Sequence, residues 1–155
     1  MHDLHRMLLS AEMRDLSDEV SRLFEELDRA VPGHRAAPTG TCAPQLDVFE
    51  TDSSIEVVMD LPGVAQDRVR VLIKEGTVLV AGEKLPTDPG ARADATFHLV
   101  ERGFGRFARA VRLTGAVDAG RATARFRSGE LRISVPKIAE RRGQEIPVRI
   151  EGEAG

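Results

Sequence analysis

The chain has 155 residues, and its 41% hydrophobic and 30% charged content suits one core with a well-solvated surface. A formal net charge of −3 argues against nucleic acid or an anionic membrane as the main partner. The one cysteine, Cys42, excludes an internal disulfide framework, and the first residues resemble neither a signal peptide nor a membrane span, so we expect a cytoplasmic protein.

Residues 1–31 are predicted to form a helical arm that ends at Pro32-Gly33. Apolar residues recur there at helical spacing and form one stripe, whose members are Leu16, Val20, Leu23, Phe24 and Leu27. Residues 32–43 lack periodicity and are rich in Pro, Gly and small residues, which predicts a flexible linker.

From residue 44 to residue 137 the apolar period switches to two, and short runs alternate with turn residues. No amphipathic helix of useful length interrupts them, so this region is predicted to be an immunoglobulin-like antiparallel β-sandwich, an all-β fold. The segment Leu85–Ala95 does not alternate and is predicted to be a long loop that is either functional or disordered. Residues 138–155 form a polar C-terminal extension that contains Ile146-Pro147-Val148.

Several passages of the sandwich region and the extension together resemble the small heat-shock proteins of the bacterial type, which share the alpha-crystallin domain. The passages are Asp60-Leu61-Pro62-Gly63-Val64, Val78–Lys84 with its final Gly82-Glu83-Lys84, His98–Phe107, Ala124 with Ser128-Gly129-Glu130-Leu131, Pro136-Lys137, and Ile146-Pro147-Val148. The resemblance covers about residues 44–150. It implies an ATP-independent holdase that binds non-native client proteins, forms a homodimer or a larger oligomer, and leaves refolding to ATP-dependent chaperones.

The arm stripe has two interpretations that the sequence leaves open. It packs on the sandwich, or it is partly exposed and binds clients. The N-terminal arm has a single aromatic residue, Phe24, which favours small or labile assemblies.

Arg109 is in phase with Phe107 and Val111 on an otherwise apolar strand face. It is either a strand-edge arginine that reaches solvent or a buried arginine that needs a carboxylate. The resemblance implies the second: Glu101 of one subunit pairs with Arg109 of the other, and the loop with the strand Phe97–Val100 crosses to the partner's sheet. The dimer-interface candidates are Phe97, Leu99, Glu101 and Arg109.

Ile146 and Val148 point the same way in an extended segment, while Pro147 favours a sheet edge. The tail is either disordered or inserts these two side chains into a groove. The groove candidates are Val69, Val71, Ile73, Ala122, Ala124 and Phe126.

Other chemistry is not indicated. Gly103–Ala108 matches G-x-G-x-x-A, but an alternating strand follows it where a nucleotide site needs a helix. No residues form a catalytic constellation, a cofactor site or a complete metal site; His2 and His5 lie at a fraying end, and Cys42 has no evident base beside it. Two rival functions are a CS-domain co-chaperone with a specific folded partner, which the tail and the long loop argue against, and an enzyme on a sandwich scaffold.

Overall fold

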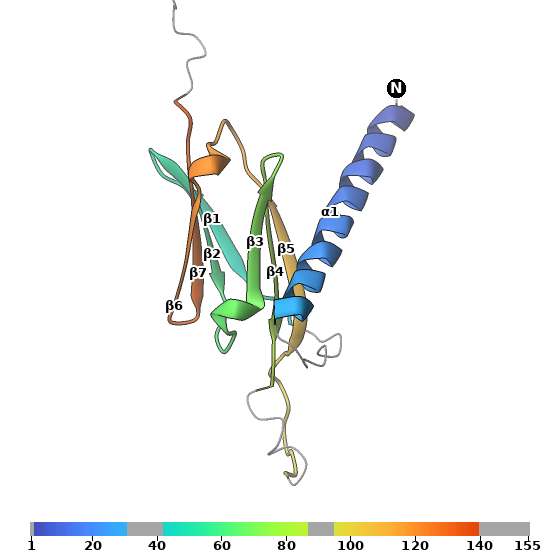
Figure 1. Ribbon diagram of the computed structural model, residues 1–155, viewed down its shortest axis with the longest axis vertical. Coiled ribbons are helices and arrows are strands. Elements are labelled where there is room, and N and C mark those ends of the chain that lie inside the picture. The colour runs from blue at the N-terminus through green and yellow to red at the C-terminus, as the bar shows by residue number, and fades with distance from the viewer. Residues whose placement is uncertain (1, 31–41, 87–94, 140–155) are drawn as a thin grey trace, which may run out of the picture.

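The computed structural model describes residues 2–30, 42–86 and 95–139, with the side chains of the first range described from residue 14 onward. Two antiparallel sheets face each other (Figure 1). The first sheet has the order β1-β2-β7-β6, with β1 (Leu46–Glu50), β2 (Ser54–Asp60), β7 (Glu130–Pro136) and β6 (Thr123–Arg127). The second has the order β3-β4-β5, with β3 (Val69–Lys74), β4 (Thr77–Lys84) and β5 (Gly105–Arg112).

The core lies between the sheets and follows the period of two that the sequence shows. Alternate residues of β2, β4 and β7 point inward and are buried, namely Ile55, Val57, Met59, Val78, Val80, Leu131, Ile133 and Val135. Since successive side chains of a strand point to opposite faces, this spacing seals one face of each sheet and leaves the other free for other contacts. The predicted all-β sandwich is confirmed.

Two hairpins are closed by two-residue turns in which both central residues have positive φ. Glu75 and Gly76 (φ 49° and 73°) join β3 to β4, and Ser128 and Gly129 (φ 52° and 78°) join β6 to β7. This backbone conformation matches the twist of the paired strands and fixes their register.

The predicted N-terminal helix is present as α1 (His2–Ala30). Its C-terminal half lies along the outside of the β3-β4-β5 sheet, whereas its N-terminal half leans away from the sandwich (Figure 1). Two short 3-10 helices, η1 (Gln66–Arg68) and η2 (Ala119–Arg121), precede β3 and β6.

The strand predicted at Phe97–Val100 is not formed. Residues 95–104 have no regular secondary structure, and Phe97, Leu99 and Val100 are 53%, 74% and 66% exposed. A strand needs a neighbour to satisfy its N–H and C=O groups, and no strand in the described part of the chain pairs with this segment. The alternation of apolar residues therefore predicted a strand that one chain alone does not complete.

Candidate functional site

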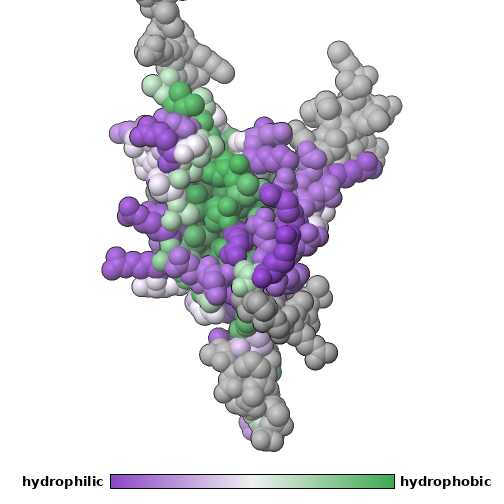
Figure 2. All heavy atoms as spheres, viewed as in Figure 1, coloured by the Kyte–Doolittle hydropathy of each residue, from purple (hydrophilic) through white to green (hydrophobic). Residues whose placement is uncertain are grey.

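The groove candidates lie on β3 and next to or on β6, at one end of each sheet. Five of the six are half-buried against the common core, namely Val69, Val71, Ile73, Ala122 and Phe126. The sixth, Ala124, is exposed. Figure 2 shows an apolar area in the middle of this face, bordered by polar side chains over β6 on the left and over α1 on the right. The structure thus brings the candidates together as an apolar surface between two sheet edges.

The arm stripe packs on the sandwich, which is the first of its two interpretations. Leu23 and Leu27 are 3% and 1% exposed, and Leu23 forms a buried cluster with Leu79 and Ala81 of β4. Val20 and Phe24 pack against the same cluster, and Leu16 is half-buried. The stripe is therefore covered in this state, and a client could contact Leu23 and Leu27 only after α1 moves.

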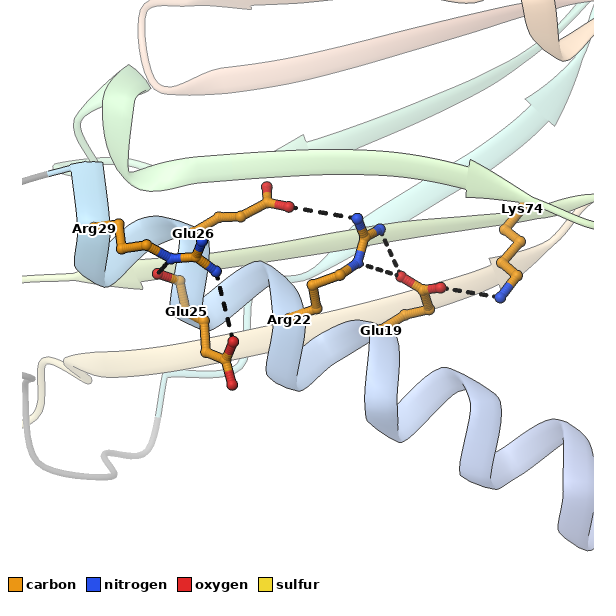
Figure 3. A network of polar contacts seen from close by, with 6 residues as sticks. All are labelled: Glu19, Arg22, Glu25, Glu26, Arg29 and Lys74. Carbon is orange, nitrogen blue, oxygen red and sulfur yellow. Dashed lines mark hydrogen bonds and ion pairs between the residues drawn. The ribbon is translucent and has the colours of Figure 1, made fainter.

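Two ion pairs hold α1 on the sheet, one on each side of the stripe. Glu19 Oε1 lies 2.9 Å from Lys74 Nζ of β3, and Glu19 also accepts hydrogen bonds from Arg22 (Figure 3). The hydrogen bond from Lys74, followed by that from Arg22, lowers the pKa of Glu19, and the same contact raises the pKa of Lys74. On the other side, Arg106 of β5 pairs with Asp28, and its guanidinium lies 5.0 Å from the centre of the Phe24 ring.

A buried carboxylate lies beneath the C-terminal end of α1. Glu83 is 1% exposed, and its carboxylate oxygens lie 3.2 Å from Arg68 Nη1 and 3.7 Å from Arg106 Nε. Sequence reasoning missed this cluster. The alternation could have indicated it, because Glu83 lies on the same strand face as Leu79 and Ala81. In the structure, Arg68 lies opposite Glu83, one residue beyond the pair Val69 and Gly82.

The dimer-interface candidates are described in a single subunit. Arg109 points toward the core, in phase with Phe107, and its Nη1 donates a hydrogen bond of 2.6 Å to the carbonyl oxygen of Pro44. Glu101 is exposed, as are Phe97 and Leu99. At the edge of the other sheet, Val48 and Phe49 of β1 are 45% and 43% exposed.

Ile146 and Val148 lie outside the described residues, as does most of the Leu85–Ala95 loop. Cys42 is half-buried, and burial raises the pKa of its thiol, so its nucleophilic thiolate form is disfavoured. Over the described ranges, no group of three or more His, Cys, Asp or Glu side chains is arranged to hold a metal ion. Over the same ranges, no helix has the uninterrupted apolar length that a membrane-spanning segment requires.

Comparison with known proteins identifies the domain. The profile described as the Hsp20/alpha crystallin family matches residues 47–151. Small heat shock protein C4 of Rickettsia felis is 30% identical over 106 residues, an alignment that covers 68% of this chain and 64% of that protein. The 21.9 kDa heat shock protein of Oryza sativa subsp. japonica is 34% identical over 141 residues, which cover 83% of this chain and 68% of that protein.

Solved structures agree with the sequence relatives. Heat shock protein 16.0 from Schizosaccharomyces pombe has a TM-score of 0.60 and 28% identity, covering 71% of this chain and 99% of that chain. A small heat-shock protein from Xylella fastidiosa has a TM-score of 0.60 and 27% identity, covering 73% of this chain and 98% of that chain. The sandwich, its strand order and these matches agree, and the chain belongs to the Hsp20/alpha crystallin family of small heat-shock proteins.

Proposed function

We propose that this protein is a holdase of the cytoplasm, which binds partly unfolded proteins and keeps them from aggregating without consuming ATP. Small heat-shock proteins are ATP-independent chaperones rather than enzymes. The observation that carries the proposal is the apolar stripe of α1, which is held on the sandwich by few contacts. Destabilised proteins expose apolar surface that aggregates, and a chaperone that prefers this state delays aggregation by mass action. Refolding then falls to ATP-dependent chaperones.

The client surface is the stripe of α1, with Leu16, Val20, Leu23, Phe24 and Leu27. Leu23 is buried against β4 and Leu27 is buried as well, so client binding requires α1 to leave the sheet. The charged remainder of the helix, which includes Arg22, Glu25, Glu26 and Arg29, keeps the complex in solution.

The building block is a homodimer. Phe97, Leu99 and Val100 are exposed on a segment without a strand neighbour in the described chain, and β1 is a sheet edge with exposed apolar side chains. The segment would gain backbone partners by adding to β1 of a second subunit. Arg109 lies against Pro44, close before β1, where the partner's Glu101 would approach its guanidinium.

Larger assemblies use the tail. Ile146 and Val148 would insert into the apolar surface of Val69, Val71, Ile73, Ala122, Ala124 and Phe126, and would also mask it from clients. The related protein from Xylella fastidiosa has a distinct high-order structure.

The test is suppression of aggregation of a heat-labile enzyme, followed by light scattering with and without ATP. The protein should suppress scattering at equimolar amounts regardless of nucleotide. Leu23→Ser/Leu27→Ser should weaken the suppression several-fold, whereas the control Asp18→Ser/Arg29→Ser, on exposed positions of the same helix, should not. The proposal would be contradicted if the wild-type protein did not suppress aggregation, or suppressed it only with ATP.

A further inference from the structure

On the outer face of the β3-β4-β5 sheet, the side chains of residues paired across neighbouring strands form rows. The register places Leu72, Leu79 and Ala110 in one row and Arg70, Ala81 and Ala108 in the next. Beyond the first row lie Lys74, Thr77 and Arg112, and beyond the second lie Glu83 and Arg106, with Arg68 bound to Glu83. The apolar side chains of these two rows thus form a band, with Arg70 at its β3 edge, Lys74 and Arg112 at one end, and Arg106 with the Glu83–Arg68 pair at the other.

The docked part of α1 is the complement of this face. Leu23, Val20 and Phe24 pack on the band, Glu19 reaches Lys74 at one end, and Asp28 reaches Arg106 at the other. The two acids are nine residues apart, which in a helix is about 13 Å. Both the apolar spacing and the sign of charge of the helix therefore match the sheet.

The contact is also incomplete. A pocket of about 70 Å³ opens where α1 leaves the sheet, and its lining includes Leu16, Leu72, Leu79 and Arg112. The docked length runs over the C-terminal half of the helix only, and the N-terminal half leans away (Figure 1). Glu19–Lys74 is partly exposed, with Lys74 46% accessible, so salt screens it. A helix that packs on the sheet over half its length only, and whose ion pairs are screened, can leave and return.

We propose that this sheet face is a helix-docking surface that accepts α1 of a second copy in place of its own, so that copies exchange helices. Every copy supplies the same acid-bounded stripe, and exchange of an identical element keeps all contacts of the docked state. Residues 31–41 join α1 to the sandwich, and the path from Ala30 to Cys42 is long enough to reach roughly 40 Å when extended. The inference does not depend on client binding.

Carbodiimide coupling of the native ion pair tests the exchange directly. The reagent joins a carboxylate and an amine in contact to form an amide with loss of water, and Lys74 is one of only three lysines, with Lys84 and Lys137. Unlabelled and ¹⁵N-labelled protein are mixed, incubated at low salt, coupled and digested for mass spectrometry. Exchange should produce links between residues 19 and 74 that join a light peptide to a heavy one, as abundant as the unmixed links together.

The same digest contains its own control. Lys137 Nζ lies 2.6 Å from Glu50 Oε1 within the sandwich, so the link between residues 50 and 137 should join only peptides of one label. Only unmixed links at residues 19 and 74 would overturn the proposal, and so would mixed links at both pairs, since these would report unspecific association.

A binding experiment covers the case in which coupling at Lys74 is inefficient. A fluorescent peptide of residues 14–30 is titrated with the full chain. Glu19→Gln/Asp28→Asn weakens the cis helix but leaves the sheet intact, so it should bind the peptide about five-fold tighter than wild type or more. The matched control Asp18→Asn/Glu25→Gln changes the charge of α1 equally, away from the sheet, and should bind as wild type does. Lys74→Gln/Arg106→Gln removes both cations of the docking surface and should bind the peptide about five-fold more weakly than wild type or worse. Equal affinity of the wild type and the three variants, or no binding by any of them, would contradict the proposal.

Discussion

At the scale of single residues, Glu83 is a buried carboxylate that lies between two arginines. Its carboxylate is withdrawn from water and lies within 4 Å of two guanidinium groups, those of Arg68 and Arg106. Such a pair adds little net stability over an apolar replacement, but removing one member leaves the other charge buried without compensation. Arg106 also reaches Asp28 and Phe24, so Glu83 positions the residue that holds the end of α1.

Glu83→Gln should therefore lower the free energy of unfolding by about 3–5 kcal/mol, because Arg68 keeps its charge at 10% exposure. The measurement is urea denaturation followed by circular dichroism. Glu25→Gln is the matched control, since the Glu25 side chain is 70% exposed and its pair with Arg29 contributes about 0–0.5 kcal/mol. If the two variants lose similar free energies of unfolding, the buried pair contributes no more to stability than the exposed pair does.

At the scale of elements, α1 is held mainly by its apolar contact. Burying Leu23 and Leu27 contributes about 1.5–3 kcal/mol each before the ordering of the helix is subtracted. The ion pairs at partly exposed Glu19 and Asp28 contribute far less, because water and salt screen them. Their role is positional, since each acid meets a cation at one fixed distance along the helix axis.

The pair Glu19–Lys74 gives α1 a dependence on pH. The pKa of Glu19 is lowered from 4.5, so its contribution is present above that pH and is lost as the pH falls through the lowered value. The pKa of Lys74 is raised from 10.5, so its contribution is present below that pH and is lost as the pH rises through the raised value.

We therefore expect Glu19→Gln to lower the melting temperature slightly at about pH 7, and the difference from wild type to vanish in acid below the range of Glu19. Circular dichroism melts of both proteins across pH measure it. Asp18→Asn, on the exposed side of the helix, is the control and should show no such pH-dependent difference. A difference that persists in acid would mean that the carboxylate charge is not what Glu19 contributes.

At the scale of the whole molecule, three of the described surfaces carry accessible apolar side chains, which is typical of a subunit of an assembly. Exposed Phe97, Leu99 and Val100 lie on one segment, exposed Val48 and Phe49 on the edge strand β1, and half-buried apolar residues on β3 and beside β6. Unpaired strand edges with apolar side chains are unusual in proteins that stay monomeric. The dimer and the tail contact proposed above would cover them in two separate steps.

Native mass spectrometry of two variants should separate these steps. Arg109→Ala should weaken the dimer, with a loss of about 3–5 kcal/mol if its guanidinium pairs with the partner's buried Glu101 carboxylate. Ile146→Ala/Val148→Ala should leave the dimer intact and shrink larger assemblies, because each side chain would lose about 1.5–3 kcal/mol of burial. Each variant is the control for the other. If both Arg109→Ala and Glu101→Ala leave the dimer constant unchanged, the pair does not hold the interface, and an unaltered mass distribution of the tail variant removes the tail from assembly.

The sequence by itself determined the sandwich class and the helix, because both depend on local periodicity. The alternation of Ile55, Val57 and Met59 can seal only one face of a sheet, and Ser128-Gly129 can adopt the two positive φ values of a tight hairpin. The apolar stripe at helical spacing likewise predicted α1. The sequence also proposes the dimer and groove candidates from short spans in phase, and their roles stay predictions.

Only the tertiary structure decided what the stripe contacts and which charges are buried. Glu19 and Lys74 are 55 residues apart, Asp28 and Arg106 78 apart, and no local pattern links them. From the sequence alone, Glu83 looks like a solvated charge. In the structure, α1 and Arg68 lie over it and bury it. The strand predicted at Phe97–Val100 stays a prediction for a related reason: alternation states which faces a segment has, but backbone pairing requires a second edge, and the described part of the single chain supplies none.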